Sequence, residues 1–409
     1  MKSGMIAGLI LAALLLAAQT GSGIPTDAGK LAEGGKENGH QDSFVQNGEK
    51  FVELNEFSKN LMKELGKTDV MSPFSAYMAL GMTAAGARGE TVKAFGCLGF
   101  DGTNSETLGA KAKSLIDYLT APEGSTVLEV ANSVWVDDAY TLRDEFSAYV
   151  KKYYSAEVFS EDLPKSVAKV NSWISDKTNG MIRDLLDEIG ESDKLLLINA
   201  VYMDAKWSDP FDPQATREGD FVTSSGEKKK MELMRKTEYT RTIDADGLEG
   251  VVLPYDDGRL EFVAILPTDG QGIDSLYESL AGEYDFASLA EKSKTERVRL
   301  TLPKLELSAT FSLKSPLSAL GMSNVFSNSA DLSGLCGEPG ELCVSDVIQS
   351  AKLKLDESGT EAAAVTIVSV KTTSLVHEEP PRVISFTSPF AYAVVDSETS
   401  TVLFTGVVE

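Results

Sequence analysis

Residues 355–370 read Leu-Asp-Glu-Ser-Gly-Thr-Glu-Ala-Ala-Ala-Val-Thr-Ile-Val-Ser-Val, and this stretch says more about the chain than any other. It opens with a charged turn and then alternates with a period of two, which is typical of a strand that buries one face. The side chains in its first half are very small, and the triplet Ala362–Ala364 has a poor intrinsic strand propensity. Small side chains would not jam between two existing strands, and Gly359 supplies a hinge. The stretch therefore predicts a loop that can become a strand of a sheet later.

The sequence Glu-Ser-Gly-Thr-Glu-Ala-Ala-Ala at residues 357–364 resembles the reactive-loop hinge of the serpin family. Further motifs of that family follow in the same order, so that the resemblance covers roughly residues 45–409. They are Met-Ser-Pro-Phe-Ser at 71–75, Asn-Ala-Val-Tyr-Met-Asp-Ala-Lys-Trp at 199–207 with Pro-Phe at 210–211, Leu-Gly-Met-Ser-Asn-Val-Phe at 320–326 with Ala-Asp-Leu-Ser at 330–333, Ser-Pro-Phe at 388–390 and Leu-Phe-Thr-Gly at 403–406. Each motif is weak by itself, but their order and spacing are highly specific.

The resemblance implies a single large α+β domain, in which helices surround mixed β-sheets and a reactive loop near the C-terminus is exposed. It also implies a trapping mechanism. A target serine protease attacks the loop as a substrate, and the cut loop then inserts into the main sheet and drags the acyl-enzyme along. The uncut state must then be metastable and kinetically held. We therefore expect a one-use protease inhibitor and not an enzyme, and leave open a non-inhibitory serpin-like carrier or chaperone protein as the alternative.

The resemblance also implies roles for individual residues. Ser72, Ser75 and Asn199 match positions beneath the parting strands of the main sheet, and Trp207 matches the position where the loop first enters it. Gln349 departs from the family, which commonly has histidine there, so no pH-dependent shutter is expected. The hinge consists of Glu357, Gly359, Thr360, Glu361, Ala362, Ala363 and Ala364.

The family's usual register places the scissile bond between Thr373 and Ser374. A small β-branched residue before that bond suits the shallow specificity pocket of an elastase-like or subtilisin-like protease. The loop looks longer than in common serpins, however, and the bond could shift. Lys371 would then suit trypsin-like proteases and Leu375 chymotrypsin-like ones, and these alternatives stay open. The whole reactive loop is expected over about residues 357–383.

The ends of the chain predict a secreted protein. Lys2 precedes an apolar run from Ile6 to Ala18, which is too short to span a bilayer and is ordered like a signal peptide. We assign residues 1–23 to that signal peptide, without a fixed cleavage point, residues 24–43 to a disordered polar arm and residues 44–409 to the serpin domain. The expected location is the extracellular space or the lumen of a secretory organelle.

Charge argues against several classes of partner. The net charge is −24 and the pI is near 4.6, which opposes binding to nucleic acid or to an anionic membrane. The helix expected around residues 105–119 has only Lys111 and Lys113 as cations, so we do not expect a glycosaminoglycan partner. The basic run at 228–230 is predicted to be a solvated turn. The expected partner is a target serine protease, bound by a monomer.

Histidines and cysteines limit the chemistry further. The only histidines, His40 and His377, fall in predicted loops, so the chain lacks the held imidazole that hydrolytic triads and most metal sites require. We expect no metal and no cofactor. Cys336 and Cys343 flank a turn-rich segment and could form a disulfide in an oxidising compartment, although sequence does not fix the pairing. Cys97 is expected to be a buried, unreactive thiol.

Hydrophobic periodicity predicts the remaining elements. Helices are expected over residues 47–66, from the N-cap Ser72 to Ala87, over 105–119 and over 167–182. Strands are expected over residues 127–136, 195–202, 251–254, 260–267 and 300–308, and a closing hairpin over 384–396 and 401–408.

Overall fold

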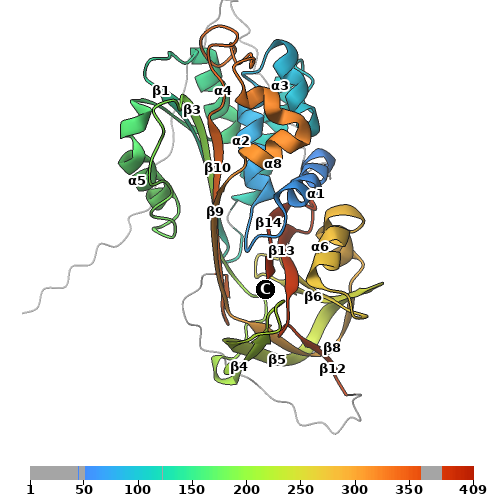
Figure 1. Ribbon diagram of the computed structural model, residues 1–409. Helices are drawn as coiled ribbons and strands as arrows, with labels where there is room; N and C mark the ends of the chain where they lie inside the picture. The colour runs from blue at the N-terminus through green and yellow to red at the C-terminus, as the bar shows by residue number, and fades with distance from the viewer. Residues whose placement is uncertain (1–44, 46–50, 122, 361–379) are drawn as a thin grey trace, which may run out of the picture. The chain divides into compact units, whose positions relative to one another are not determined.

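Two mixed β-sheets form the framework of the fold (Figure 1). The computed structural model describes residue 45 and residues 51–121, 123–360 and 380–409. The first sheet, which we call the main sheet, has six strands in the order β2-β1-β3-β11-β10-β9. The second has eight, in the order β12-β8-β5-β6-β7-β13-β14 with β4 paired to β5. Helices combined with large mixed sheets confirm the predicted α+β class.

Helices predominate in the first part of the described chain, and runs of consecutive strands predominate in the rest. The strands are β1 (Val127–Asp137), β2 (Glu157–Glu161), β3 (Leu195–Lys206), β4 (Arg217–Val222), β5 (Lys228–Ala245), β6 (Leu248–Pro254), β7 (Leu260–Pro267), β8 (Lys294–Pro303), β9 (Leu305–Ser312), β10 (Asp346–Leu355), β11 (Gly359–Thr360), β12 (Arg382–Ser385), β13 (Phe390–Asp396) and β14 (Val402–Val408). The helices are α1 (Val52–Leu65), α2 (Pro73–Ala84), α3 (Ser105–Leu119), α4 (Asp144–Tyr154), α5 (Val167–Lys177), α6 (Ile273–Gly282), α7 (Phe286–Glu291) and α8 (Lys314–Leu317). Shorter helical segments are η1 (Gly89–Leu98), η2 (Leu163–Lys165), η3 (Pro213–Ala215), η4 (Ser318–Met322) and η5 (Ser323–Phe326).

Helix α2 lies in the core, against the main sheet and beside α1 and α3 (Figure 1). Every residue of α2 is buried, as expected for a helix that is apolar on all sides. Its N-terminus is capped by Ser72, whose hydroxyl accepts a hydrogen bond from the Ser75 amide at 3.2 Å, and Pro73 occupies the first turn. Gly81 allows close packing, because a Cβ there would lie 2.7 Å from the Tyr154 hydroxyl. The predicted capping of this helix is confirmed.

The two central strands of the main sheet are β3 and β10, which run parallel. Strand β3 is buried along nearly its whole length, which is typical of a central strand covered on both faces. Its other edge pairs with β1 in an antiparallel ladder. Helix α5 contacts β1 and β3, and α2 contacts β1, β3 and β10. The main sheet therefore lies between two helical layers, and any strand added to it becomes buried.

The structure corrects three of the predicted elements. The basic run at 228–230 is the start of strand β5 rather than a turn, and Lys228 and Lys230 both bind Asp220 on the adjacent strand β4. Residues 300–308 form two strands, since β8 and β9 belong to different sheets. Residues 384–396 are likewise divided, because β12 pairs with β8 whereas β13 pairs with β7 and β14. Alternation identifies a strand but does not identify its sheet.

Two helices are also shorter than predicted. Helix α2 ends at Ala84 rather than at Ala87. Helix α5 ends at Lys177 rather than at residue 182, because Asn179 and Gly180 both have positive φ values and cannot continue a helix. Helix α3 has the predicted bounds, Ser105–Leu119. Among the described residues, no helix is long and apolar enough to cross a membrane.

Candidate functional site

Strands β3 and β10 separate at one end of the main sheet, and β11 lies between them. Direct pairing of the two strands ends at Val201 and Ala351. Farther along, Thr360 lies opposite Ala205 of β3 and Leu355 of β10. Thr360 is only 1% exposed, so it is an interior residue of the sheet. The first residues of the predicted hinge thus already pair with both strands in the uncut chain. We call this place the insertion point.

The side chain of Thr360 is held by an aromatic stack. Its hydroxyl oxygen lies 2.8 Å from the hydroxyl oxygen of Tyr255. Burial raises the pKa of Tyr255 well above its ordinary value, so this phenol stays neutral. The Tyr255 ring stacks on Trp207 with centroids 4.7 Å apart, and the Trp207 indole donates to the Asp356 carbonyl at 2.9 Å. Trp207 therefore connects the turn before the hinge to the residue that enters the sheet.

Gly359 is required at the insertion point because no side chain fits there. Its φ is +154°, which lies in a region that glycine adopts readily. A Cβ at this position would lie 2.0 Å from the Ala205 carbonyl oxygen and 2.6 Å from the Lys206 Cα. The backbone of β11 can approach β3 this closely only without a Cβ.

Glu357 fixes the turn that leads into β11. Its carboxylate accepts a hydrogen bond from the Thr216 hydroxyl at 2.7 Å and pairs with Lys304 at 3.1 Å. Its carbonyl accepts from the Phe211 amide at 2.8 Å. Burial would raise the pKa of Glu357, but the bonds from Thr216 and Lys304 outweigh it and hold the pKa below its ordinary value. We call Glu357 with Thr216 and Lys304 the tether.

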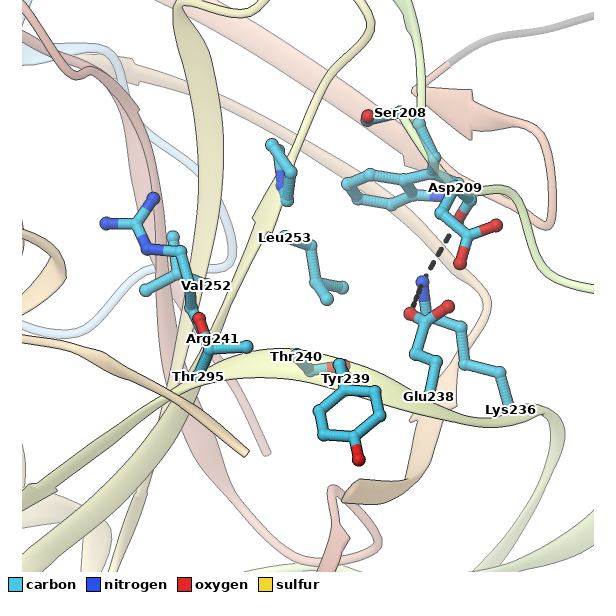
Figure 2. A pocket seen from close by; sticks show the side chains of 12 residues that line it. Ser208, Asp209, Lys236, Glu238, Tyr239, Thr240, Arg241, Val252, Leu253 and Thr295 are labelled. Carbon is cyan, nitrogen blue, oxygen red and sulfur yellow. Dashed lines mark hydrogen bonds and ion pairs between the residues drawn. The ribbon is translucent and has the colours of Figure 1, made fainter. Parts of the chain in front are cut away.

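A cavity of about 290 Å³ lies beside Trp207, between β5 and the end of β6 (Figure 2). Lys236 and Glu238 point from β5 toward Asp209 (Figure 2). The Lys236 ammonium pairs with Glu238, donates to the Asp209 carbonyl at 2.9 Å and lies 4.6 Å from the centroid of the Phe211 ring. Burial lowers the pKa of Lys236 to about 8. Lys236 thereby fixes the segment whose Phe211 amide holds the turn at Glu357.

Farther along the sheet, Gln349 joins β10 to the start of α2. Its amide oxygen accepts from the Ser72 backbone N–H at 3.0 Å, and its amide nitrogen donates to the Ser72 carbonyl at 2.7 Å. Both residues are buried. This two-way bond satisfies one donor and one acceptor on each partner, as an amide side chain can.

A second polar chain joins β3 and β1 to the helices. The Ser75 hydroxyl donates to the Asn199 side-chain oxygen, and the Asn199 amide donates to the Asn132 side-chain oxygen. Asn132 in turn donates to the Tyr154 carbonyl of α4 at 2.8 Å. The two chains are side by side, because Gln349 pairs with Asn199 in the ladder between β10 and β3. We call Ser72, Ser75, Asn132, Asn199 and Gln349 together the polar joint.

Comparison with known proteins identifies the family. The family model described as "Serpin (serine protease inhibitor)" matches residues 52–409, nearly the whole described chain. The chain belongs to the serpin family. At the family level, that description supports a non-enzyme whose partner is a serine protease.

Individual serpins support the same assignment. Iripin-8 of Ixodes ricinus is 31% identical over 387 residues, which cover 90% of this chain and 95% of Iripin-8. The native crystal structure of tengpin, a thermophilic serpin, superimposes with a TM-score of 0.79 at 29% identity and covers 94% of this chain and 97% of tengpin. Human thyroxine-binding globulin has a TM-score of 0.77 at 24% identity over 90% of this chain and 98% of that chain, which shows the fold alone.

The predicted site residues of this serpin fall into two groups in the structure. Glu357, Gly359, Thr360 and Trp207 meet at the insertion point, whereas four others lie in the polar joint. Those four are Ser72, Ser75, Asn199 and Gln349. The remaining predicted positions lie outside the described residues, and their roles stay predictions. They are Glu361, Ala362, Ala363, Ala364, Lys371, Thr373, Ser374 and Leu375.

The three cysteines are free thiols in the structure. The disulfide between Cys336 and Cys343 is therefore absent from it. Cys336 is buried, and its backbone forms an isolated antiparallel β-bridge with Leu142. Burial raises the pKa of its thiol to about 11. Cys97 is half-buried rather than buried as expected. Desolvation still raises the pKa of its thiol, which is the direction expected for an unreactive thiol.

Sequence reasoning missed several residues of the site. Tyr255, Thr216 and Lys304 contact the hinge from segments far away in sequence, and nothing local to them indicates that contact. Asn132 left a weak signal, because it is an amide in the buried half of β1 and pairs with Asn199 in register. An amide in such a strand needs a buried partner.

Replacing Gly359 with Ala should expel β11 from between β3 and β10, because the new Cβ has no space against the Ala205 carbonyl. We expect faster amide hydrogen exchange in residues 355–360 and altered Trp207 fluorescence. The matched control is Gly226→Ala, at a positive-φ glycine with open space around it. Unchanged exchange in Gly359→Ala would contradict the insertion of β11 in the uncut chain.

Replacing Gln349 with Met should lower the free energy of unfolding by about 2 kcal/mol, because the buried Ser72 N–H loses its partner and the Ser72 C=O keeps only the bond from the Ala76 amide at 3.2 Å. Denaturant unfolding of the uncut protein measures this change. Lys352→Met on the same strand is the control, since it removes only a partly exposed ion pair with Glu306 and should cost under about 1 kcal/mol. Equal effects of the two substitutions would argue against the polar joint as a stabilising contact.

The tether should weaken in acid. Because its folded pKa is below the ordinary value, the Glu357 carboxylate contributes stability above about pH 4.5, and this contribution is lost as the pH falls through the lowered pKa. The melting temperature of Glu357→Gln should therefore lie below that of the wild type at pH 7 and approach it near pH 3. Glu306→Gln, which breaks an exposed ion pair, should show little difference at either pH. A difference between Glu357→Gln and wild type that does not change with pH would exclude this ionic contribution.

Proposed function

We propose that this serpin is a secreted, one-use inhibitor that traps a serine protease as an acyl-enzyme by inserting its cut reactive loop into the main sheet. The observation that supports this proposal most is the position of Thr360 between β3 and β10. Because the first residues of the inserting strand already lie between β3 and β10, insertion only has to extend this strand and does not have to start a new one. Secretion rests on the signal-peptide pattern of residues 1–23.

The register at Thr360 extends to a full strand. Each step forward from Thr360 moves one step back along β3 from Ala205, so ten steps bring Val370 opposite Leu195, the first residue of β3. The alternating segment recognised in the sequence thus has the length of the strand that it would pair with. The direct β3–β10 pairing would be replaced by antiparallel pairing on both sides of the new strand, and antiparallel pairing is slightly more stable per residue.

The same register explains why the hinge has small side chains. The face that Thr360 presents to the core would next carry Ala362 and Ala364, opposite Met203 and Val201 of β3. Both of these β3 residues are buried in the main core. Alanine adds little volume there, whereas larger side chains would crowd a packed core.

Thr366 would reach the polar joint. Six steps from Thr360 bring it opposite Asn199 on β3 and opposite Gln349 on β10. The two amides bond to Ser72, Ser75 and Asn132 rather than to each other, so they can keep these partners when β3 and β10 part. A threonine hydroxyl between them can both donate to and accept from the amide groups. An apolar residue at this position could not form such a bond.

The target is proposed to be elastase-like or subtilisin-like, cut at Thr373–Ser374, with Lys371 and Leu375 as alternative positions before the bond. The alternative function is that of a non-inhibitory carrier or chaperone. Residues 362–366 contain no proline and no charged residue, and either would obstruct insertion. The hinge therefore favours inhibition.

Incubation with elastase-, subtilisin-, trypsin- and chymotrypsin-type proteases tests this function. We expect at least one covalent complex that survives boiling in detergent, and cut serpin that melts tens of degrees above the uncut form, because about ten residues gain ladder hydrogen bonds. Thr360→Arg should convert the inhibitor into a substrate, since insertion would bury an unpaired charge. The control Thr141→Arg changes an exposed threonine and should still trap. Plain cleavage by every enzyme, without a complex and without a rise in melting temperature, would favour the carrier function.

A further inference from the structure

The sheet face next to the distal end of the reactive loop carries arginines and exposed apolar side chains. Strand β12 follows directly after the described chain resumes at residue 380. In register, Val383 of β12 lies beside Arg299 of β8, which lies beside Thr237 of β5. In the next row, Arg297 lies beside Tyr239. We call these five residues the β8 face.

The β8 face exposes more apolar surface than its strands require. Tyr239 is 71% exposed, the highest value for a large hydrophobic side chain among the described residues, and Val383 is 58% exposed. Figure 2 shows the Tyr239 ring turned away from Lys236 and Glu238, its neighbours along β5. The alternate positions of the same strands, Val298 and Ile384, are fully buried. An exposed tyrosine beside arginines is the composition of a protein–protein contact.

The charge of the β8 face is opposite to that of the chain. The chain has a net charge of −24, yet the rows that form this face carry Arg297 and Arg299 and no carboxylate. The acidic residues of these strands occupy the alternate register. Glu238 pairs with Val298 in the ladder, and Glu296 binds Arg382 at 3.0 Å. A basic spot in an acidic protein attracts an acidic partner at short range, within about 8 Å at physiological salt.

We propose that the β8 face is a secondary contact surface for the target protease and binds an acidic patch beside the protease active site. This proposal rests on the proposed function, because it needs a protease at the reactive loop. Val383 follows Ser374 by nine residues, which span at most about 30 Å when extended. A globular domain of about 230 residues has a radius of gyration of roughly 17 Å. A protease held at the scissile bond therefore reaches the β8 face.

The β8 face affects the rate at which the serpin and the protease associate, and it does not affect insertion of the reactive loop. None of its residues belongs to β3, β10 or β11, so its contacts do not change the sheet that receives the loop. Charges at the rim of an interface mainly raise the association rate. The stoichiometry of inhibition, which depends on insertion outpacing deacylation, is then independent of the face.

Two variants test the proposal on the full chain: Arg297→Glu with Arg299→Glu, and Tyr239→Ala. The control is Lys151→Glu with Arg183→Glu, which makes the same charge change at exposed positions in and near the helices α4 and α5, far from β8 (Figure 1). With the proteases that the wild type traps, the second-order inhibition rate constant of the arginine variant should fall about tenfold in low salt and recover in high salt. The rate constant of Tyr239→Ala should fall several-fold at either salt concentration. The stoichiometry of inhibition and the melting temperature of both variants should stay at wild-type values.

Each failure has a distinct signature. If both variants inhibit every trapped protease at the same rate as the control, the proposal for the β8 face is wrong, and the proposed function is unaffected. A wild type that traps none of the proteases overturns the proposed function, and the β8 face is rejected with it. Heparin retention that is lost in the arginine variant, together with unchanged inhibition rates, would assign the face to a polyanion and also overturn the proposal.

Discussion

The limited pairing between β3 and β10 is the constraint on which the rest of the structure depends. The strands are bonded directly only as far as Val201 and Ala351, although both continue beyond those residues. A sheet cannot leave the inner edges of two buried strands unpaired, so the gap must be filled. Among the described residues, Gly359 and Thr360 of the hinge occupy its far end, where they pair with Lys206, Ala205 and Leu355. The chain thus keeps in its central sheet a place that a longer segment of the same sequence can occupy.

The polar joint would allow β3 and β10 to part more readily than an apolar contact would. Buried amides and hydroxyls stabilise little in net terms, because their hydrogen bonds replace bonds to water. They do impose a strict condition, since each must find a partner in every arrangement of the strands. Side chains that both donate and accept, such as Gln349, Asn199 and Ser75, can exchange one set of partners for another. A purely apolar contact between α2 and the sheet would resist parting without offering the new strand any specific register.

The sequence predicted the local features of this serpin well and the long-range ones poorly. The cap at Ser72, the bounds of α3 and the alternating hinge all follow from short-range patterns, and the structure confirms the first two. The division between β8 and β9 was not predicted, although the apolar positions shift by one residue from Leu300 and Leu302 to Leu305 and Leu307. The contacts of Tyr255 with Thr360 and of Lys304 with Glu357 depend on which strands become neighbours. The period of the apolar residues indicates which face of a strand is buried, whereas the neighbours of that strand and its register with them depend on tertiary pairing.

The two ends of the reactive loop are fastened to different sheets, and this limits how strongly the β8 face can bind. The proximal end lies in the main sheet at Thr360, whereas the distal end is held by β12 and by Arg382, which binds Asp244, Glu249 and Glu296. In the proposed mechanism, a cut between them leaves an acylated protease on the proximal side, so the protease must leave the β8 face as the strand inserts. Tight binding to that face would oppose insertion by the same free energy. A small patch that speeds the encounter but holds weakly satisfies both steps, and it fits a face with two arginines, one tyrosine and one valine better than a large hydrophobic interface would.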